Sequence, residues 1–360
     1  MDKLQLLKQA SFGARVAEDE ASELATYFVE TDQWTRIARG EIDVIRGEKG
    51  AGKSAIYSLL MSKVDDFFDR NILLVAAERP RGTPVFKDLV ADPPASELEF
   101  VGMWKLYILT LIAQRMREYA MTGEAARRVY SALEGAGLLE PEFDLSGALR
   151  LVLDYARRVV RAESVEGGFT LDPNTGMPAF SGKITFREPG VELRQRGFLS
   201  VDSLIASANS ALTNAGYQLW VLLDRLDVAF AETNELERNA LRALFRVYRD
   251  MSGHDAIKLK IFLRTDIWER ITDAGFREAS HITKFVVLQW ASPSLLNLVV
   301  RRLLKNDHIV RAFGIDREGG LRDFSAQHEL FYRFFPPQVE QGTRKPSTFD
   351  WMSVDVLMAP

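Results

Sequence analysis

The sequence predicts an α/β fold built on a mainly parallel five-stranded sheet that is flanked by helices. Short apolar runs typical of buried strands are the first observation, and they lie at residues 42–45, 71–76, 218–224, 257–264 and 284–288. Helical patterns separate most of these runs by more residues than a hairpin needs, as parallel strands require. A glycine-rich loop follows the first run and precedes a helix, which is the third observation.

The glycine-rich loop spans residues 47–54, Gly-Glu-Lys-Gly-Ala-Gly-Lys-Ser. It matches the pattern G-x-x-x-x-G-K-[ST], known as the P-loop, whose backbone cradles phosphate groups. Apolar residues at helical spacing between positions 56 and 64 predict a helix directly after it. A glycine turn before a helix also arises by chance, and the order of strand, loop and helix is what favours a phosphate site here.

The residue types of the loop suit a nucleoside triphosphate. Glycines let consecutive backbone N–H groups turn toward phosphate oxygens, and the following helix adds its positive end. Lys53 is expected to reach the β- and γ-phosphates as a catalytic charge, and the Ser54 hydroxyl to hold Mg²⁺. The residues expected to bind ATP are Gly47, Glu48, Lys49, Gly50, Ala51, Gly52, Lys53, Ser54 and Ala55.

A carboxylate for Mg²⁺ is expected at the end of a neighbouring strand. Asp224 directly follows the apolar run 219–223 and is the predicted second metal residue beside Ser54. The alternative is that this aspartate caps a turn at the end of its strand.

The catalytic base is harder to identify, because Arg225 stands where many ATPases carry a glutamate. Asp227 is the predicted base or water-orienting residue, with Glu232 as a weaker candidate, although a carboxylate at either position also suits a helix cap. Arg264, or the neighbouring Thr265, ends the next strand and is expected to sense the γ-phosphate, unless it only forms a surface ion pair there. Because Arg225 replaces the usual glutamate, slow hydrolysis and a nucleotide-controlled switch both remain open as interpretations.

The order of elements predicts a P-loop NTPase core interrupted by an insertion, because far more residues separate Lys53 from Asp224 than one crossover needs. A turn-rich stretch before residues 180–186 predicts a β-hairpin inside that insertion. The C-terminal region is expected to form a helical lid, and truncation of the chain at its end is left open. The expected divisions are an N-terminal helical segment 1–40, core 41–120, inserted helical and hairpin subdomain 121–200, core 201–292 and lid 293–360.

One helix, expected at residues 234–251, carries four arginines on one face, which we call the arginine stripe: Arg238, Arg242, Arg246 and Arg249. Such a stripe is most often a solvated surface. It would also suit binding to a nucleic-acid backbone or the supply of an arginine to a neighbouring subunit.

Composition excludes several classes of function. The 360 residues include no cysteine, which excludes disulfides and thiolate chemistry, and the four histidines are scattered. The net charge of −4 does not favour nucleic acid. No apolar run is long enough to cross a bilayer and no secretory signal is apparent, so a cytoplasmic location is expected.

The sequence resembles bacterial P-loop ATPases of the additional-strand class (ASCE). It looks closest to a poorly characterised group that opens with Phe-Gly and an Ala-Glu-Asp-Glu run, here at residues 12–13 and 17–20, and that has an Asp-Arg-Leu-Asp motif, here at 224–227. More distantly it is similar to STAND and KAP signalling ATPases. The resemblance implies ATP rather than GTP, and a setting in bacterial stress or phage defence.

The leading hypothesis is therefore a Mg²⁺-dependent ATPase, a hydrolase with slow turnover, whose nucleotide state controls a conformation or an assembly with itself or a protein partner. Two alternatives stay open: a DNA- or RNA-acting motor that uses the arginine stripe, and a non-hydrolysing scaffold that retains ATP.

Overall fold

The structure is a computed structural model that describes residues 8–13, 28–78, 85–87, 94, 96–140, 144–164, 183–226, 234–273, 275–340, 342, 343 and 345–353. The chain divides into two compact units. The terminal unit comprises residues 1–41, 46–62 and 286–360, and the central unit comprises residues 42–45 and 63–285. Each unit is described separately below.

The described strands confirm the predicted α/β class. Five strands form a mainly parallel sheet in the order β2-β5-β6-β1-β7, and β5 pairs in parallel with both β2 and β6. Their bounds are β1 Val44–Gly47, β2 Ile72–Ala76, β5 Gln218–Leu223, β6 Ile257–Arg264 and β7 Phe285–Leu288. In β2, β5 and β6 nearly every residue is buried, as expected for strands covered on both faces.

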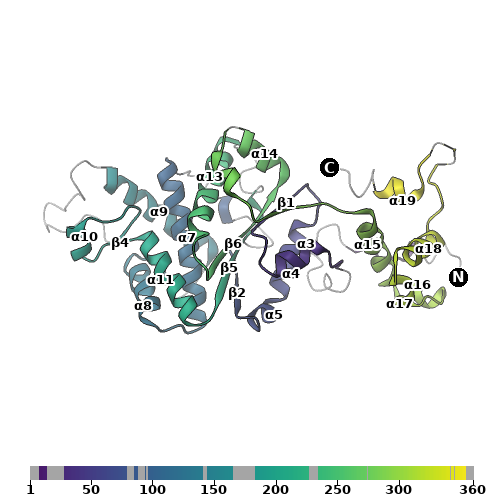
Figure 1. Ribbon diagram of the computed structural model, residues 1–360, viewed down its shortest axis with the longest axis horizontal. Helices are drawn as coiled ribbons and strands as arrows, with labels where there is room; N and C mark the ends of the chain where they lie inside the picture. The colour runs from purple at the N-terminus through teal and green to yellow at the C-terminus, as the bar shows by residue number, and fades with distance from the viewer. Residues whose placement is uncertain are drawn as a thin grey trace. The chain divides into compact units, whose positions relative to one another are not determined.

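Long helices cover the sheet in the central unit. In Figure 1, α7 runs beside α9, α11 and α13. Helix α7 is buried almost all round, because it packs against β2 and β5 as well as against these helices. The helical elements of this unit are α5 Val64–Phe68, η2 Val85–Lys87, α7 Glu97–Glu118, α8 Glu124–Gly135, α9 Leu145–Ser164, α10 Val191–Gln195, α11 Val201–Asn214, α13 Asn234–Met251, α14 Thr265–Asp273 and η3 Arg277–His281.

Of the residues predicted to form the β-hairpin, the structure describes only 183–186, so the hairpin stays a prediction. Strand β3, Ile184–Thr185, pairs in parallel with β4, Leu199–Ser200. The Tyr155 hydroxyl lies beside β3, where it accepts a hydrogen bond from the Ile184 backbone N–H at 2.9 Å. The turn-rich residues 167–176 lie outside the described residues.

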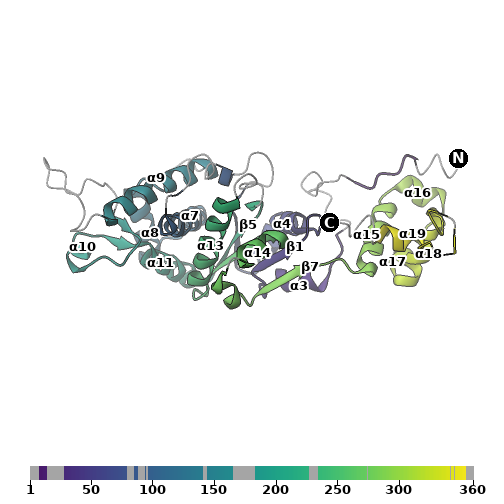
Figure 2. The ribbon, with the colours of Figure 1, turned by 90° about the horizontal axis from the view of Figure 1, so that it is seen from above.

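The terminal unit contains a separate group of C-terminal helices, which Figure 2 shows clustered together. Their core includes Leu303, Phe331 and Phe334. Asn306 also binds a stretch near the start of the chain: its amide accepts from Ser11 N at 2.8 Å and donates to Ser11 O at 3.0 Å. The helices of this unit are α3 Asp32–Ala38, α4 Lys53–Ser62, α15 Ser292–Leu304, α16 Asp307–Ala312, α17 Arg317–Leu321, α18 Phe324–Phe334 and α19 Thr348–Trp351.

A side-chain cap marks the start of helix α3. The Thr31 side chain accepts a hydrogen bond from Trp34 N at 3.2 Å, which satisfies one N–H group at the start of the helix. Across the whole described chain, none of the helices combines the length and the apolar composition that a membrane span requires.

Candidate functional site

The glycine-rich loop connects β1 to α4 within the terminal unit. Gly50 has φ +87° and Gly52 has φ +96°, a region that residues with a Cβ rarely adopt. A Cβ on Gly47 would lie 2.9 Å from the Ala51 Cβ, so that position also excludes a side chain. Each of the three glycines therefore has a structural reason to be glycine.

Lys53 lies across this loop. Its ammonium Nζ donates hydrogen bonds to Gly47 O at 2.7 Å and to Glu48 O at 2.9 Å. Glu48 O also accepts from Ala51 N at 3.1 Å, which closes the turn. The backbone thereby holds a positive charge at the start of α4, where the helix dipole also favours an anion.

The loop is accessible and the helix behind it is firmly anchored. Residues 48–50 are exposed and residues 51–55 are partly exposed. Five successive residues of α4, 56–60, are buried. An anion can therefore reach the loop from solvent, while the helix that supports the loop stays fixed.

Trp290 lies beside the loop, although the sequence did not single it out as a site residue. Its Cζ2 lies 3.6 Å from the position that a Cβ on Gly52 would take, and its side chain is only partly buried. Leu288, at the end of β7, contacts the loop similarly at Gly47. The end of β7 and the residues after it thus form one wall of the loop.

In the central unit, Asp224 directly follows β5 and is 6% exposed. The next residue, Arg225, has φ +58°, an uncommon conformation for a residue that is not glycine, asparagine or aspartate. Backbone outliers of this kind cluster at functional sites because the surrounding structure must hold them. The end of β5 is therefore a constrained turn that carries a buried carboxylate.

The end of β6 presents two polar residues in different states. Arg264 donates from Nε and Nη2 to the two carboxylate oxygens of Asp266, each at 2.9 Å. The Thr265 hydroxyl oxygen is buried and has no hydrogen-bond partner among the described residues. Because a buried polar group without a partner costs free energy, Thr265 is a better candidate for ligand contact than Arg264.

A buried carboxylate that the sequence analysis missed, Glu78, follows β2. It is 1% exposed, and both of its oxygens accept from Val85 N, at 3.0 and 2.8 Å. In the parallel β2–β5 ladder the last pair is Ala76 with Leu222, so Glu78 and Asp224 each follow this pair by two residues at the same end of the sheet. The available signal was a glutamate two residues after a buried apolar run, which becomes meaningful only once the strand order is known.

Several other predicted site residues either lie outside the described residues or belong to different units. Asp227 and Glu232, the candidate bases, and residues 17–20 of the acidic run lie outside the described residues. Asp224 and Arg264 belong to the central unit, and Lys53 and Ser54 to the terminal unit. Joint action of Ser54 and Asp224 on one Mg²⁺ therefore stays a prediction.

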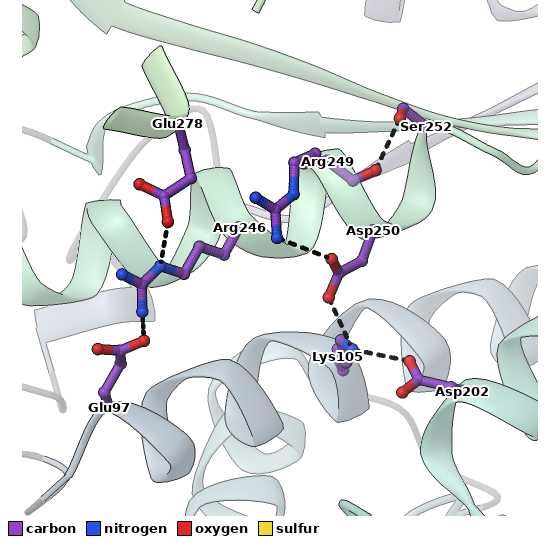
Figure 3. Close-up of polar contacts among 8 residues, drawn as sticks. All are labelled: Glu97, Lys105, Asp202, Arg246, Arg249, Asp250, Ser252 and Glu278. Carbon is purple, nitrogen blue, oxygen red and sulfur yellow. Dashed lines mark hydrogen bonds and ion pairs between the residues drawn. The ribbon is translucent and has the colours of Figure 1, made fainter. Parts of the chain in front are cut away.

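The arginine stripe of α13 is not a bare cationic surface. Figure 3 shows Arg246 bound by two carboxylates, Glu97 at the start of α7 and Glu278, the latter at 3.1 Å. Arg242 donates from Nη2 to Ile271 O at 2.9 Å. These contacts join α13 to α7, α14 and η3, while both arginines stay partly exposed.

Lys105 makes a second internal link, also drawn in Figure 3. This α7 residue lies 2.8 Å from Asp202 of α11 and 2.9 Å from Asp250 of α13. Burial lowers the pKa of Lys105, but the hydrogen bonds and the negative charges of both aspartates together outweigh it, so the net pKa is raised. Arg249 forms an ion pair with Asp250 at 3.6 Å, so a third arginine of the stripe also has a partner. The polar residues along α13 therefore hold helices together.

The donors present fit a Mg²⁺-triphosphate. Lys53 supplies a fixed positive charge, Ser54 a hydroxyl, and the positive-φ glycines a turn whose residues are exposed or partly exposed. Comparisons with known proteins bring no further guide to function, since no family model, no curated protein and no solved structure matches the chain significantly.

Proposed function

We propose that the chain is a Mg²⁺-dependent ATPase with slow turnover, whose nucleotide state switches its conformation or its assembly. The observation that carries the proposal is the glycine loop, in which two positive-φ glycines and the bridging ammonium of Lys53 form a preorganised anion site. The positive charge and the loop amides would bind the β- and γ-phosphates, and Ser54 with Asp224 would hold the metal ion. A bound Mg²⁺ would supply charge neutralisation at the phosphates.

Two carboxylates are candidates for the base that accepts a proton from the attacking water. Asp227 is the candidate from the sequence. Glu78 is the candidate from the fold, because it is buried, bound by Val85 N, and follows β2 at the end of the sheet where Asp224 follows β5. Both compete for the same role, since only one group needs to take the proton.

Thr265 completes the proposal at the end of β6. A buried hydroxyl without a described partner can donate to a phosphate oxygen or accept from a bound water. In this role it replaces Arg264, whose guanidinium fork already binds Asp266.

The rival functions have less support. The nucleic-acid motor rested on the arginine stripe, and Arg242 and Arg246 bind groups of their own unit instead. The non-hydrolysing scaffold is retained as the second candidate, because Arg225 replaces the usual glutamate after the metal-binding aspartate.

Equilibrium binding of ATP tests the proposal, with Lys53→Ala and Lys49→Ala as a matched pair. Lys53→Ala removes the bridging ammonium and should weaken ATP binding by roughly tenfold or more. Lys49 is exposed in the same loop, with no side-chain partner among the described residues, and alanine keeps the backbone N–H through which this position would bind phosphate. Lys49→Ala should therefore stay within about twofold of the natural chain. Equal affinities for all three proteins would refute the site.

Phosphate release then separates enzyme from scaffold and one base from the other. Glu78→Gln and Asp227→Asn should each leave ATP affinity nearly unchanged, and only the variant at the true base should lose turnover. Tight ATP binding by the natural chain without any phosphate release would favour the scaffold. Light scattering with and without ATP measures the assembly.

A further inference from the structure

A cavity of about 560 Å³ opens in the central unit, at the end of the sheet where β5 and β6 begin. Gln218 and Ile257, the first residues of these strands, line it. Asp224 and Thr265 lie instead where the same strands end. The cavity is therefore separate from these two residues of the candidate functional site.

Positive charge predominates around this cavity. Its lining includes three cationic side chains, of which Arg249 already pairs with Asp250, together with two imidazoles and two carboxylates: Arg249, Lys258, Lys284, His254, His281, Asp43 and Asp255. Of these carboxylates, Asp43 is already neutralised, because it accepts hydrogen bonds from Lys260 Nζ at 2.8 Å and from the Tyr248 hydroxyl at 3.3 Å.

Two lysines of the lining are left without counter-charge. The ammonium groups of Lys258 and Lys284 form no ion pair or hydrogen bond with any described residue. Both lie close enough to buried Lys260 to lower its pKa. Lys258, Lys284 and buried Lys260 thus converge near Asp43, whose charge Lys260 already balances, and Asp255 is the other carboxylate of the lining. The excess of positive charge repels cations and attracts anions.

We propose that this cavity binds a compact oxyanion that carries at least two negative charges, of the phosphate or pyrophosphate class. Lys258 and Lys284 supply the charge, and the Tyr248 and Asp43 pair forms a fixed polar wall. A small ligand is favoured over a nucleic-acid backbone because the site is a hollow of limited volume and the chain has a net charge of −4. The proposal does not depend on ATP hydrolysis.

Inorganic pyrophosphate is a suitable probe, used in calorimetric titration of the full chain. The titration is made in the Lys53→Ala background, so that the glycine loop contributes as little as possible. One saturable site is expected. Lys258→Gln/Lys284→Gln should weaken it by roughly tenfold or more, whereas Lys258→Arg/Lys284→Arg should retain it within a few-fold.

A matched control removes the same amount of charge elsewhere. Lys8→Gln/Lys183→Gln changes two exposed lysines outside the cavity and should leave pyrophosphate affinity within about twofold. Thermal unfolding of each variant checks that it is folded. Absence of saturable binding in the Lys53→Ala chain, or equal affinity in the glutamine and control variants, would overturn the proposal. Tighter binding of a short DNA duplex that displaces pyrophosphate would overturn the choice of a small ligand.

Discussion

Lys260 carries an ammonium group into the core of the central unit, and its protonation should govern how the stability of that unit changes in alkaline solution. The side chain is 0% exposed, with Nζ 2.8 Å from Asp43 Oδ1 and 4.3 Å from the centroid of the Trp220 ring. Burial lowers the pKa of Lys260 to about 8; Asp43 acts in the opposite direction, while Lys258 and Lys284 lower it further.

The size and sign of the effect follow from these values. The ordinary pKa is 10.5, so the shift corresponds to about 3 kcal/mol. Below pH 8 both the folded and the unfolded chain hold this proton, and the folded state bears the full cost of burying the charge. Between pH 8 and 10.5 the folded chain releases the proton and the unfolded chain keeps it. The contribution of Lys260 to stability therefore rises with pH through this interval.

The comparison protein should remove both partners, because Lys260→Met alone leaves Asp43 buried without its ammonium partner. Relative to Asp43→Asn/Lys260→Met, the natural chain should gain about 3 kcal/mol in free energy of unfolding between pH 7 and pH 10.5. Urea unfolding followed by circular dichroism measures the difference. Nuclear magnetic resonance of lysine labelled at the ε-carbon measures the pKa directly.

A midpoint for Lys260 at or above the ordinary lysine value would refute this reasoning. So would parallel pH profiles of stability for the two proteins.

Three further predictions concern the loop, the end of β6 and the helices. Thr265→Val should leave the melting temperature unchanged or higher, because a buried hydroxyl without a described partner is removed, yet slow phosphate release by roughly tenfold; unchanged turnover would exclude ligand contact. ATP should change the tryptophan fluorescence of the natural chain and not that of Trp290→Phe, because Trp290 borders the loop at Gly52; an equal change in both would place the response elsewhere. Lys105→Met should lower the free energy of unfolding by about 1 kcal/mol in urea denaturation, since both partner aspartates are partly exposed and can be hydrated; a loss of several kcal/mol would contradict this.

The sheet was predictable because its strands are apolar without interruption. In β5, Leu219 to Leu223 are all buried, and such a run has no other common explanation at that length. The first strand begins two residues later than predicted, at Val44, while Asp43 just before it serves as the partner of Lys260. The pairing of β3 with β4 was not predictable, because strands of two residues carry no periodic pattern.

For the candidate site, the sequence predicted the features that depend on residues close together in the chain. The glycine loop is encoded within eight residues, so its turn and its lysine contacts follow from neighbours in the chain. The ladder that brings the ends of β2 and β5 together, and with them Glu78 and Asp224 to one end of the sheet, joins segments far apart in the chain, which no local pattern records. Helical spacing likewise identified the face that carries Arg246, but not the carboxylates of Glu97 and Glu278 that this face meets.

The two hydrogen bonds between Asn306 and Ser11 affect how shortened versions of the protein should be designed. A version that starts after Gly13 would strip the 7%-exposed amide of Asn306 of two hydrogen bonds and would uncover Phe335, on which Phe12 packs with ring centroids 6.5 Å apart. Deleting residues 1–13 would thus expose apolar surface of the C-terminal helices and promote aggregation. An affinity tag should therefore be added before this segment and should not replace it.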